Sequence, residues 1–412
     1  MTNEIDYHCA KHVAVNQMKN SVQEFSLNVL YISYVANPAS GSESGSGWAI
    51  LEYYLELNFK VSILCGPTAK KDIVSRLKDY PDQWEIISLN QSTFLDKLLN
   101  LLPIFSLQFK SLVWNLKILR EWEKILSERK ISFVHYATFA GDWNVCAPLF
   151  RSAINVLWGP VGGSQKVPKE LIFSLGFTGL ISESLRTLIT SPFRQLNRLL
   201  VFLNKRVLVL SLNDAVQKVF STDKRKSPLV SNIVLPCLTS KDFWCESESN
   251  YFFAAGRLIA LKNWQLALRS LAILDDSSRL LIAGDGPQRR ALGRMAKKLR
   301  IEDRVVFLGE VTHRECIDLM LASKGVVFPS LRDSQPWALA EAAHYGVPSI
   351  ALDTSGSRAI CNFAGLDLVP ITKSYIVRDF ASRMRNANPP TNLAVFCKCR
   401  LHDRLFSLIP RE

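Results

Sequence analysis

The sequence lacks the signatures of several common classes of protein. Its nine cysteines form no CxxC pair and no Cys/His spacing typical of a metal site, so free thiols in a reducing cytosol are favoured over a zinc site or a disulfide framework. Neither a GxGxxG fingerprint nor a GxxxxGK[ST] loop occurs, which disfavours a dehydrogenase and an NTPase. No helix-turn-helix, zinc-finger or RNP-like pattern is present, so nucleic acid is the least favoured partner.

Targeting and membrane-spanning signals are also missing. The first twenty residues contain no apolar h-region of a signal peptide. No run of eighteen or more uncharged apolar residues occurs, which disfavours a transmembrane helix. We therefore expect a cytoplasmic protein, which in one interpretation is peripheral at the inner face of the membrane.

Positive charge, by contrast, is abundant. The net charge is +13 over 412 residues, and a phosphate-rich substrate, an anionic membrane surface or nucleic acid would each complement it. Between Arg186 and Lys226 nine Lys/Arg stand against two Asp, interleaved with the apolar run LLVFLNKRVLVL. Segment 170–205 is therefore predicted either to touch anionic lipid or to be an ordinary helix with a solvated basic face.

Short apolar runs alternate with helical patterns along most of the chain. This alternation predicts an α/β protein with doubly wound parallel sheets and helices on both faces. It occurs once before about residue 235 and again after about residue 250, so two Rossmann-like domains are predicted to face each other across a cleft. The expected strands are 27–34, 60–65, 84–89, 131–136, 154–158, 206–211, 251–256, 279–284, 304–308, 325–328 and 348–352.

The predicted domains are 1–238 and 250–375, with a Pro- and Ser-containing linker between them. Segment 376–412 is expected to be helical and, in one interpretation, to return to the first domain. Segment 92–130 is a long amphipathic stretch broken near Pro103. It is predicted either to pack on the first sheet or to present an apolar patch to a membrane.

Cations follow the first strand of the second domain. That strand ends at Gly256, Arg257 comes directly after it, and Lys262 follows five residues later. Two cations at the mouth of a sheet can hold a diphosphate, although taken alone such residues are more often solvated surface charges.

Glycines and carboxylates follow the next strand ends. Gly284 and Gly286 would let backbone amides approach an anion or a flat base. Asp333 precedes a helix expected to begin near Pro336, with Ser334 as its N-cap, and Glu341 is expected about two turns inside it. Carboxylates of this kind accept hydrogen bonds from sugar hydroxyls, but each could also be a cap or a solvated helix residue.

Five short motifs follow one another in a fixed order between residues 250 and 360. They are Gly256-Arg257 with Lys262, Gly284-Asp285-Gly286-Pro287, Phe307-Leu308-Gly309, Pro329-Ser330, and Asp333 with Glu341 followed by Ala-Ala-His-Tyr-Gly-Val-Pro. In this order they resemble glycosyltransferase family 4, whose members have the GT-B fold, use nucleotide-sugar donors and retain the anomeric configuration. In the first half, GSESGSGWA, VHYATFAGDW and WGPVGGSQKVP are similar to signatures of a bacterial polysaccharide branch of that family.

The resemblance implies roles for particular residues. Arg257 and Lys262 would hold the donor diphosphate, Asp333 the sugar hydroxyls, and Glu341 the ribose. The first domain would bind the acceptor and the second the donor. The expected donor-side residues also include Gly45, Gly47, Gly256, Gly284, Gly286, Ser334, Gln335, Pro336 and Trp337, and Gly162 and Gly163 are expected on the acceptor side.

Departures from the family pattern qualify this assignment. Asp333 stands where Glu is usual, and Pro336 removes one backbone amide from a stretch that is usually glycine-rich. A second histidine is absent at Ala137, so His135 is either a catalytic residue or a buried strand histidine. Ser357-Arg358 stands where a Glu is usual.

We expect a retaining glycosyltransferase that uses no metal or other cofactor and transfers a sugar to a polysaccharide or lipid-linked glycan. The alternatives are a degenerate GT-B protein that binds a glycan or partner without turnover, and a nucleotide-sugar epimerase or hydrolase on the same fold. The identities of the sugar, the base and the acceptor are not specified by these motifs.

Overall fold

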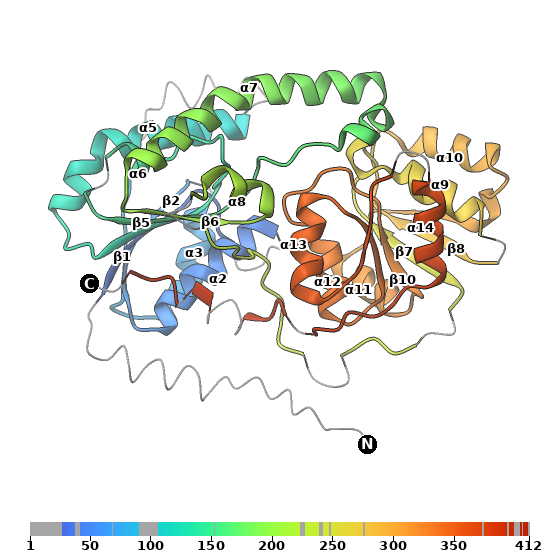
Figure 1. Ribbon diagram of the computed structural model, residues 1–412. Coiled ribbons are helices and arrows are strands. Elements are labelled where there is room, and N and C mark those ends of the chain that lie inside the picture. The colour runs from blue at the N-terminus through green and yellow to red at the C-terminus, as the bar shows by residue number, and fades with distance from the viewer. Residues whose placement is uncertain are drawn as a thin grey trace.

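The computed structural model describes residues 27–37, 42–67, 69–89, 106–151, 153–222, 227–238, 242–246, 249–274, 277–372, 375–393, 395–398, 404–405 and 407–410. Their strands form two separate sheets of six strands each, and every strand pairing is parallel (Figure 1).

The first sheet has the order β3-β2-β1-β4-β5-β6. Its strands are apolar along most of their length because helices cover both faces, as expected for buried parallel strands. Their bounds are β1 (Asn28–Ser33), β2 (Lys60–Cys65), β3 (Trp84–Ile86), β4 (Phe133–Thr138), β5 (Asn155–Val161) and β6 (Val207–Ser211).

Two groups of helices cover this sheet. One face packs against α2 (Ser42–Glu56) and α3 (Ala69–Leu77). The other packs against α5 (Ser106–Ser127), α6 (Ala147–Phe150) and α8 (Asp214–Phe220), together with the end of α7 (Gly176–Leu203), which follows the short helix η1 (Lys169–Leu175).

The second sheet has the order β12-β11-β10-β7-β8-β9. All eleven strands expected from the sequence are present, whereas the two-residue β12 is too short to leave a pattern. The bounds are β7 (Tyr251–Ala255), β8 (Arg279–Ala283), β9 (Val305–Gly309), β10 (Gly325–Phe328), β11 (Ser349–Leu352) and β12 (Leu368–Val369).

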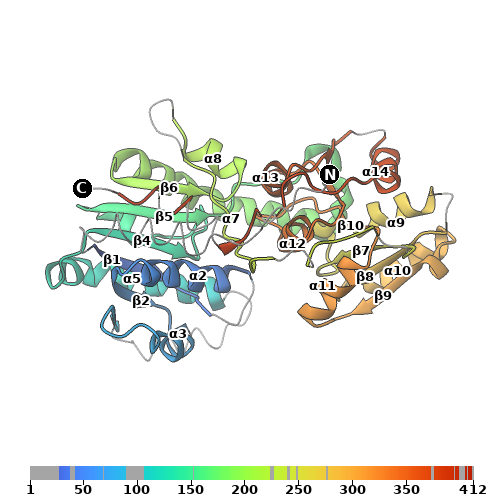
Figure 2. The same ribbon diagram turned by 90° about the horizontal axis from the view of Figure 1, so that it is seen from below.

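The helices of the second domain also lie on both faces of their sheet (Figure 2). One core includes α9 (Trp264–Ala272), α10 (Arg289–Lys298) and α14 (Ile376–Arg385). The opposite cores include α11 (His313–Leu321), α12 (Trp337–His344) and α13 (Ser355–Ala364). Two single turns, η2 (Ala260–Lys262) and η3 (Glu302–Arg304), lie in connecting loops.

The C-terminal segment contacts both domains. Helix α14 packs on the second sheet through Phe380 and Met384. Farther on, Lys398 pairs with Glu56 of α2 at 2.9 Å, and Leu405 belongs to the core of the first domain. The tail therefore ties the two domains together outside the linker.

Helix α5 forms most of the described part of segment 92–130. Trp114, Ile118, Trp122 and Ile125 are buried against the sheet, so the packing interpretation holds for this helix. The expected break near Pro103 lies outside the described residues.

Helix α7 behaves differently, because it runs along one side of the molecule and reaches over both domains (Figure 1). Residues Lys169–Leu203 are long and apolar enough to cross a membrane by length and composition alone, and only 6% of the most apolar window is buried. The sequence analysis disfavoured a membrane-spanning helix because no run of eighteen uncharged apolar residues occurs. That criterion misses this helix, since its most apolar window has a mean hydropathy of 1.2 although a few charged residues interrupt the apolar run.

Candidate active site

The loops that carry the predicted donor residues meet at one edge of the second sheet. Because all six strands are parallel, the segments after β7, β8 and β10 emerge on the same side. Two hydrogen bonds join the first two loops, from Gly256 N to Ala283 O and from Leu258 N to Asp285 O, both at 2.9 Å. A third, from Leu331 N to Leu261 O at 2.8 Å, adds the loop after β10.

The predicted glycines of these loops pack against backbone of the same domain. A Cβ at Gly284, whose φ is +119°, would overlap the carbonyl of Gly256. A Cβ at Gly286 would lie 2.7 Å from the carbonyl oxygen of Leu258. Because Gly284 and Gly286 have no side chain, the loop after β8 can pack directly on the loop after β7. The two glycines therefore support a ligand site by holding these strand ends close together.

Lys262 and Asp333 form an ion pair at this edge. The Nζ–Oδ2 distance is 2.5 Å, and the two side chains keep 19% and 23% of their exposure. The same ammonium lies 4.9 Å from the centre of the Phe328 ring, at the end of β10. The structure therefore places the predicted diphosphate cation directly beside the predicted sugar-binding carboxylate.

Arg257 lies exposed at the start of the same loop. Its carbonyl accepts a hydrogen bond of 3.1 Å from Trp264 Nε1, which fixes the backbone there. Within the described part of the chain its guanidinium forms no ion pair, so it remains available to an anion.

Glu341 is buried in α12, and its Oε1 lies 2.8 Å from Nε2 of His313 at the start of α11. Burial raises the pKa of Glu341, and the hydrogen bond from His313 opposes that rise. The carboxylate lies just over one turn inside the helix, because α12 begins at Trp337.

His313 was not identified from the sequence. A signal for it exists, because Thr312 and Glu315 form a capping box at the start of α11. That pattern marks a helix beginning right after β9, which places His313 at the same edge of the sheet.

The loop before α12 contacts the first domain. The N-cap residue is Pro336 and no side chain caps the helix, so the predicted capping role of Ser334 is wrong. Instead Ser334 Oγ accepts a hydrogen bond of 2.6 Å from Gln165 Nε2. Gln335 Oε1 accepts bonds from Ser231 Oγ at 3.1 Å and from the amide of Asn232 at 3.0 Å. Trp337 packs against an apolar cluster that contains residues of α12 and α13 together with Ile233 and Leu235.

The acceptor-side glycines face this loop. A Cβ at Gly162 would lie 3.4 Å from Ser334 Oγ. Gly163 has φ of +114°, and a Cβ there would overlap the carboxylate of Asp142. The two glycines therefore lie against the second domain and against a buried acid of their own domain.

Asp142 forms the centre of a polar cluster that the sequence did not reveal. Its carboxylate is fully buried, pairs with Arg194 of α7 and accepts a hydrogen bond from Ser164. Asn197 of the same helix donates to the Asp142 carbonyl at 2.9 Å. These partners come from distant parts of the chain, so no local pattern marks them.

Gly45 and Gly47 are inside a helix. Helix α2 begins at Ser42, and the expectation of a loop that extends to a helix start near Trp48 is therefore wrong. A Cβ at Gly47 would lie 2.6 Å from the carbonyl oxygen of Val35 and from a methyl group of Thr138. The absent side chain lets the first turns of α2 pack on the ends of β1 and β4.

His135 lies in the interior of the first domain. It is fully buried in β4, with Nδ1 2.7 Å from Tyr54 Oη and Nε2 2.8 Å from the carbonyl oxygen of Gly159. Burial lowers its pKa to about 4. The structure does not bring this side chain to the cleft, which favours the interpretation of a satisfied strand histidine.

The segment with Arg358 forms a second contact between the domains. Its guanidinium pairs with Asp214 of α8 at 2.6 Å and with Asp353 at 2.7 Å. The hydrogen bond to Asp353 raises the pKa of Arg358 the most, and the hydrogen bond to Asp214 raises it further. A Cβ at Gly356 would overlap the carbonyl of Asp333, so the start of α13 lies directly behind the site.

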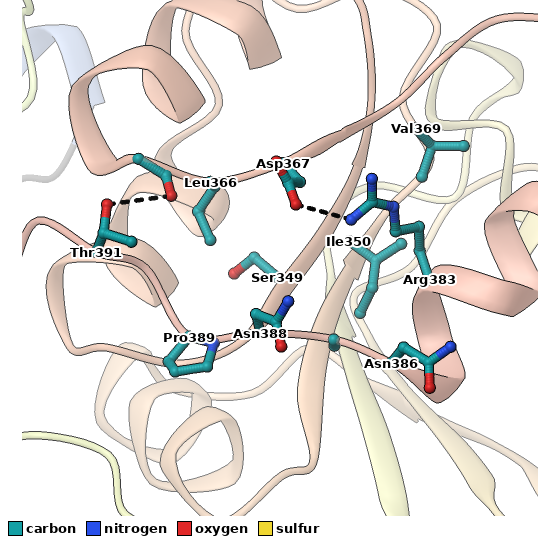
Figure 3. A pocket seen from close by; sticks show the side chains of 12 residues that line it. Ser349, Ile350, Leu366, Asp367, Val369, Arg383, Asn386, Asn388, Pro389 and Thr391 are labelled. Carbon is teal, nitrogen blue, oxygen red and sulfur yellow. Dashed lines mark hydrogen bonds and ion pairs between the residues drawn. The ribbon is translucent and has the colours of Figure 1, made fainter.

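Two further features bear on ligand chemistry. Among the described residues no group of three or more His, Cys, Asp or Glu could hold a metal ion. A small cavity of about 180 Å³ is lined by the first residues of β11 and by the segment after α14 (Figure 3). Because it lies at the start of β11, it is at the opposite edge of the sheet from Lys262 and Asp333.

Comparisons with known proteins agree with the two-sheet architecture. The structure of HepE from Anabaena in complex with UDP superposes with a TM-score of 0.52 at 14% identity, over 93% of this chain and 95% of that one. The lipopolysaccharide outer core galactosyltransferase WaaB gives a TM-score of 0.54 at 15% identity, over 92% and 95%. The chain has the GT-B fold.

Sequence similarity is concentrated in the second half. Residues 241–364 match the family model of glycosyl transferases group 1. The O-antigen chain mannosyltransferase RfbU of Salmonella typhimurium is 29% identical over 172 residues, 41% of this chain and 45% of that protein. The 2-deoxystreptamine glucosyltransferase of Streptomyces kanamyceticus is 30% identical over 113 residues, 27% and 28% of the two chains. The aligned residues thus span less than half of each relative.

Proposed function

We propose that this GT-B chain is a retaining glycosyltransferase of family 4 that moves a sugar from a nucleoside diphosphate donor to a hydroxyl of a polysaccharide or lipid-linked glycan. The observation that carries the proposal is the Lys262–Asp333 pair at the carboxyl edge of the second sheet. It joins a cation suited to a diphosphate with a carboxylate suited to sugar hydroxyls. The named relatives support sugar transfer as the class of reaction.

The proposed chemistry is mainly electrostatic. The acceptor oxygen bonds to the anomeric carbon as the bond from that carbon to the diphosphate oxygen breaks, and the acceptor proton passes to the departing diphosphate. Lys262 and Arg257 neutralise the charge that develops on this leaving group. We propose that they replace a divalent metal, and assays with a chelator test this point.

Asp333 has a second task in this scheme. Its Oδ2 accepts a hydrogen bond of 2.5 Å from Lys262 Nζ. When a donor is bound, the diphosphate takes over part of the charge of Lys262, and the carboxylate becomes free to accept hydrogen bonds from the sugar. Glu341, fixed by His313, would accept from the ribose.

The first test is a screen of UDP- and GDP-sugars for thermal stabilisation, followed by an assay of nucleotide release. A ligand at about 100 times its Kd adds about 2.7 kcal/mol to the stability of the folded state. We expect Lys262→Ala to lower the rate of release by about 10²- to 10³-fold, because a group that stabilises developing charge is removed. Lys324→Ala is the matched control, since Lys324 precedes β10 at the opposite edge of the sheet.

Two outcomes would contradict the proposal. Binding without release from any donor would favour a degenerate GT-B protein that binds a glycan or partner. Interconversion of free nucleotide sugars without an acceptor would favour an epimerase on this fold.

A further inference from the structure

Helix α7 and the turn before it expose an unusual amount of apolar surface. Eleven large apolar side chains between residues 173 and 203 are at least 40% exposed, whereas three others reach this exposure in the rest of the described chain. The most exposed are Phe173, Phe177, Leu188, Phe202 and Leu203, between 67% and 83%. Patches of this extent mark interaction sites on soluble domains.

The exposed side chains form one continuous face. The successive spacings along Phe177, Ile181, Leu185, Leu188 and Leu199 are four, four, three and eleven residues, close to one, one, one and three helical turns, so these side chains lie along one side of the helix. The 28 residues of α7 give the helix a length of about 42 Å at 1.5 Å per residue. Figure 1 shows the helix along one side of the molecule, above both domains.

The opposite side of α7 is held by polar contacts to both domains. Glu183 pairs with Arg332 of the second domain at 3.2 Å. Arg194 pairs with buried Asp142 of the first domain. A helix that crossed a bilayer would have to leave these partners, so the contacts favour a helix that lies flat on a surface.

Cations lie at both ends of the apolar face. Exposed Lys166 and Lys169 precede it, and exposed Arg198, Lys205 and Arg206 lie near its end. No lysine or arginine in the central part of α7 is exposed. Apolar side chains in the middle and cations at the ends suit an anionic lipid surface, where the cations reach the head groups.

A groove of about 1140 Å³ lies beside the last turns of α7. Its walls include Leu199, Phe202 and Phe220, and Arg198 and Lys205 also line it. Apolar walls next to cations fit an acyl chain with an anionic head group. A second copy of this chain fits less well, because either orientation of two α7 helices would bring the cationic ends against like charge.

We propose that the outer face of α7 is a membrane-binding surface for anionic lipid. The helix lies in the plane of the interface with its apolar face toward the acyl chains. The inference goes beyond the proposed function, because it concerns binding to a lipid surface whatever group the chain transfers. Membrane binding through α7 would also bring the cleft near the membrane. Arg186 on the inner side of α7 donates a hydrogen bond to the carbonyl of Gln165, and the side chain of Gln165 in turn contacts Ser334 in the cleft.

The test is flotation of the full chain with vesicles of phosphatidylcholine alone or with phosphatidylglycerol added. We expect binding to the anionic vesicles only, weakened by high salt. The triple variant Phe177→Ser, Leu188→Ser, Phe202→Ser should reduce the bound fraction at least about tenfold, because it removes apolar area from the interface. Tyr375→Ser, an exposed residue of the second domain, is the matched control and should bind as the parent does.

Further outcomes separate the alternatives. Equal flotation of the triple variant and the parent would overturn the proposal. A dimer in solution that the triple variant converts to a monomer would show that the face binds a second copy, and resistance to extraction at high pH would show a spanning helix. Thermal unfolding and nucleotide release without vesicles are measured on the same variants, so a failure of the proposed activity is seen separately.

Discussion

The two walls of the cleft use charge in opposite ways. In the second domain Lys262 and Asp333 are about one fifth exposed, and Arg257 is exposed at the same edge. In the first domain the Asp142 carboxylate is fully buried and is paired with Arg194 of its own domain. A ligand can therefore reach the charges of the second domain, whereas those of the first hold its loops in place.

Removing the buried acid should have the largest effect. Asp142→Ala would leave Arg194 buried without its partner, which costs about 3–5 kcal/mol in comparable cases. We expect the urea midpoint of unfolding to fall accordingly, together with the loss of activity. If the midpoint is unchanged, Asp142 does not have the structural role that separates the two walls.

The outcome for the fold shows which features are local. All expected strands are present in the structure. Each is a contiguous apolar run, because a strand of a parallel sheet that is buried on both faces has apolar residues at adjacent positions. The start of α2 was missed because Gly45 and Gly47 have low helix propensity. Gly47 is nevertheless required there, since a side chain would strike Val35 and Thr138.

In the candidate site, too, some residues follow from local sequence patterns and others depend on long-range contacts. Lys262, Asp333 and Glu341 each follow a strand end, so parallel topology alone predicts that they share one edge. Asp142 and Arg194 are 52 residues apart, and Gln165 and Ser334 are 169 apart. Such pairs depend on how distant segments pack against one another, which no local pattern specifies.

Buried His135 predicts an acid-sensitive first domain. Its pKa is about 4 in the folded state against about 6.5 when unfolded. Between these values the unfolded chain binds more protons, so stability falls as the pH drops from about 6.5 to 4, by about 3 kcal/mol for this group. His135→Gln should remove this contribution from the pH dependence of unfolding measured with urea. An unchanged slope would show that the group titrates normally.

Asp333 tests whether the second wall works by contact with substrate. Asp333→Asn keeps the size but not the charge, and we expect nucleotide release to fall about tenfold to hundredfold. Stability should change by less than about 1 kcal/mol, because the pair is partly exposed. Asp333→Glu restores the charge and should recover part of the rate. A large loss of stability with Asp333→Asn would instead assign this wall the structural role seen in the first domain.

Arg358 joins the two walls and should give the smallest change. Its pair with Asp214 is about one fifth to one third exposed, so Arg358→Ala should cost less than about 1 kcal/mol of stability. Its effect should appear in domain closure, because among the described residues Asp214 then keeps the hydrogen bond from Ser355 as its contact across the interface. We expect faster hydrogen exchange in residues 334–337 and a several-fold higher KM for the donor, with little change in kcat.

Lys218→Ala is the matched control, since Lys218 contacts the same carboxylate at 3.5 Å from within the first domain. Equal exchange in the two variants would mean that Arg358 does not hold the domains together, and that the contacts of Gln165 and Gln335 suffice.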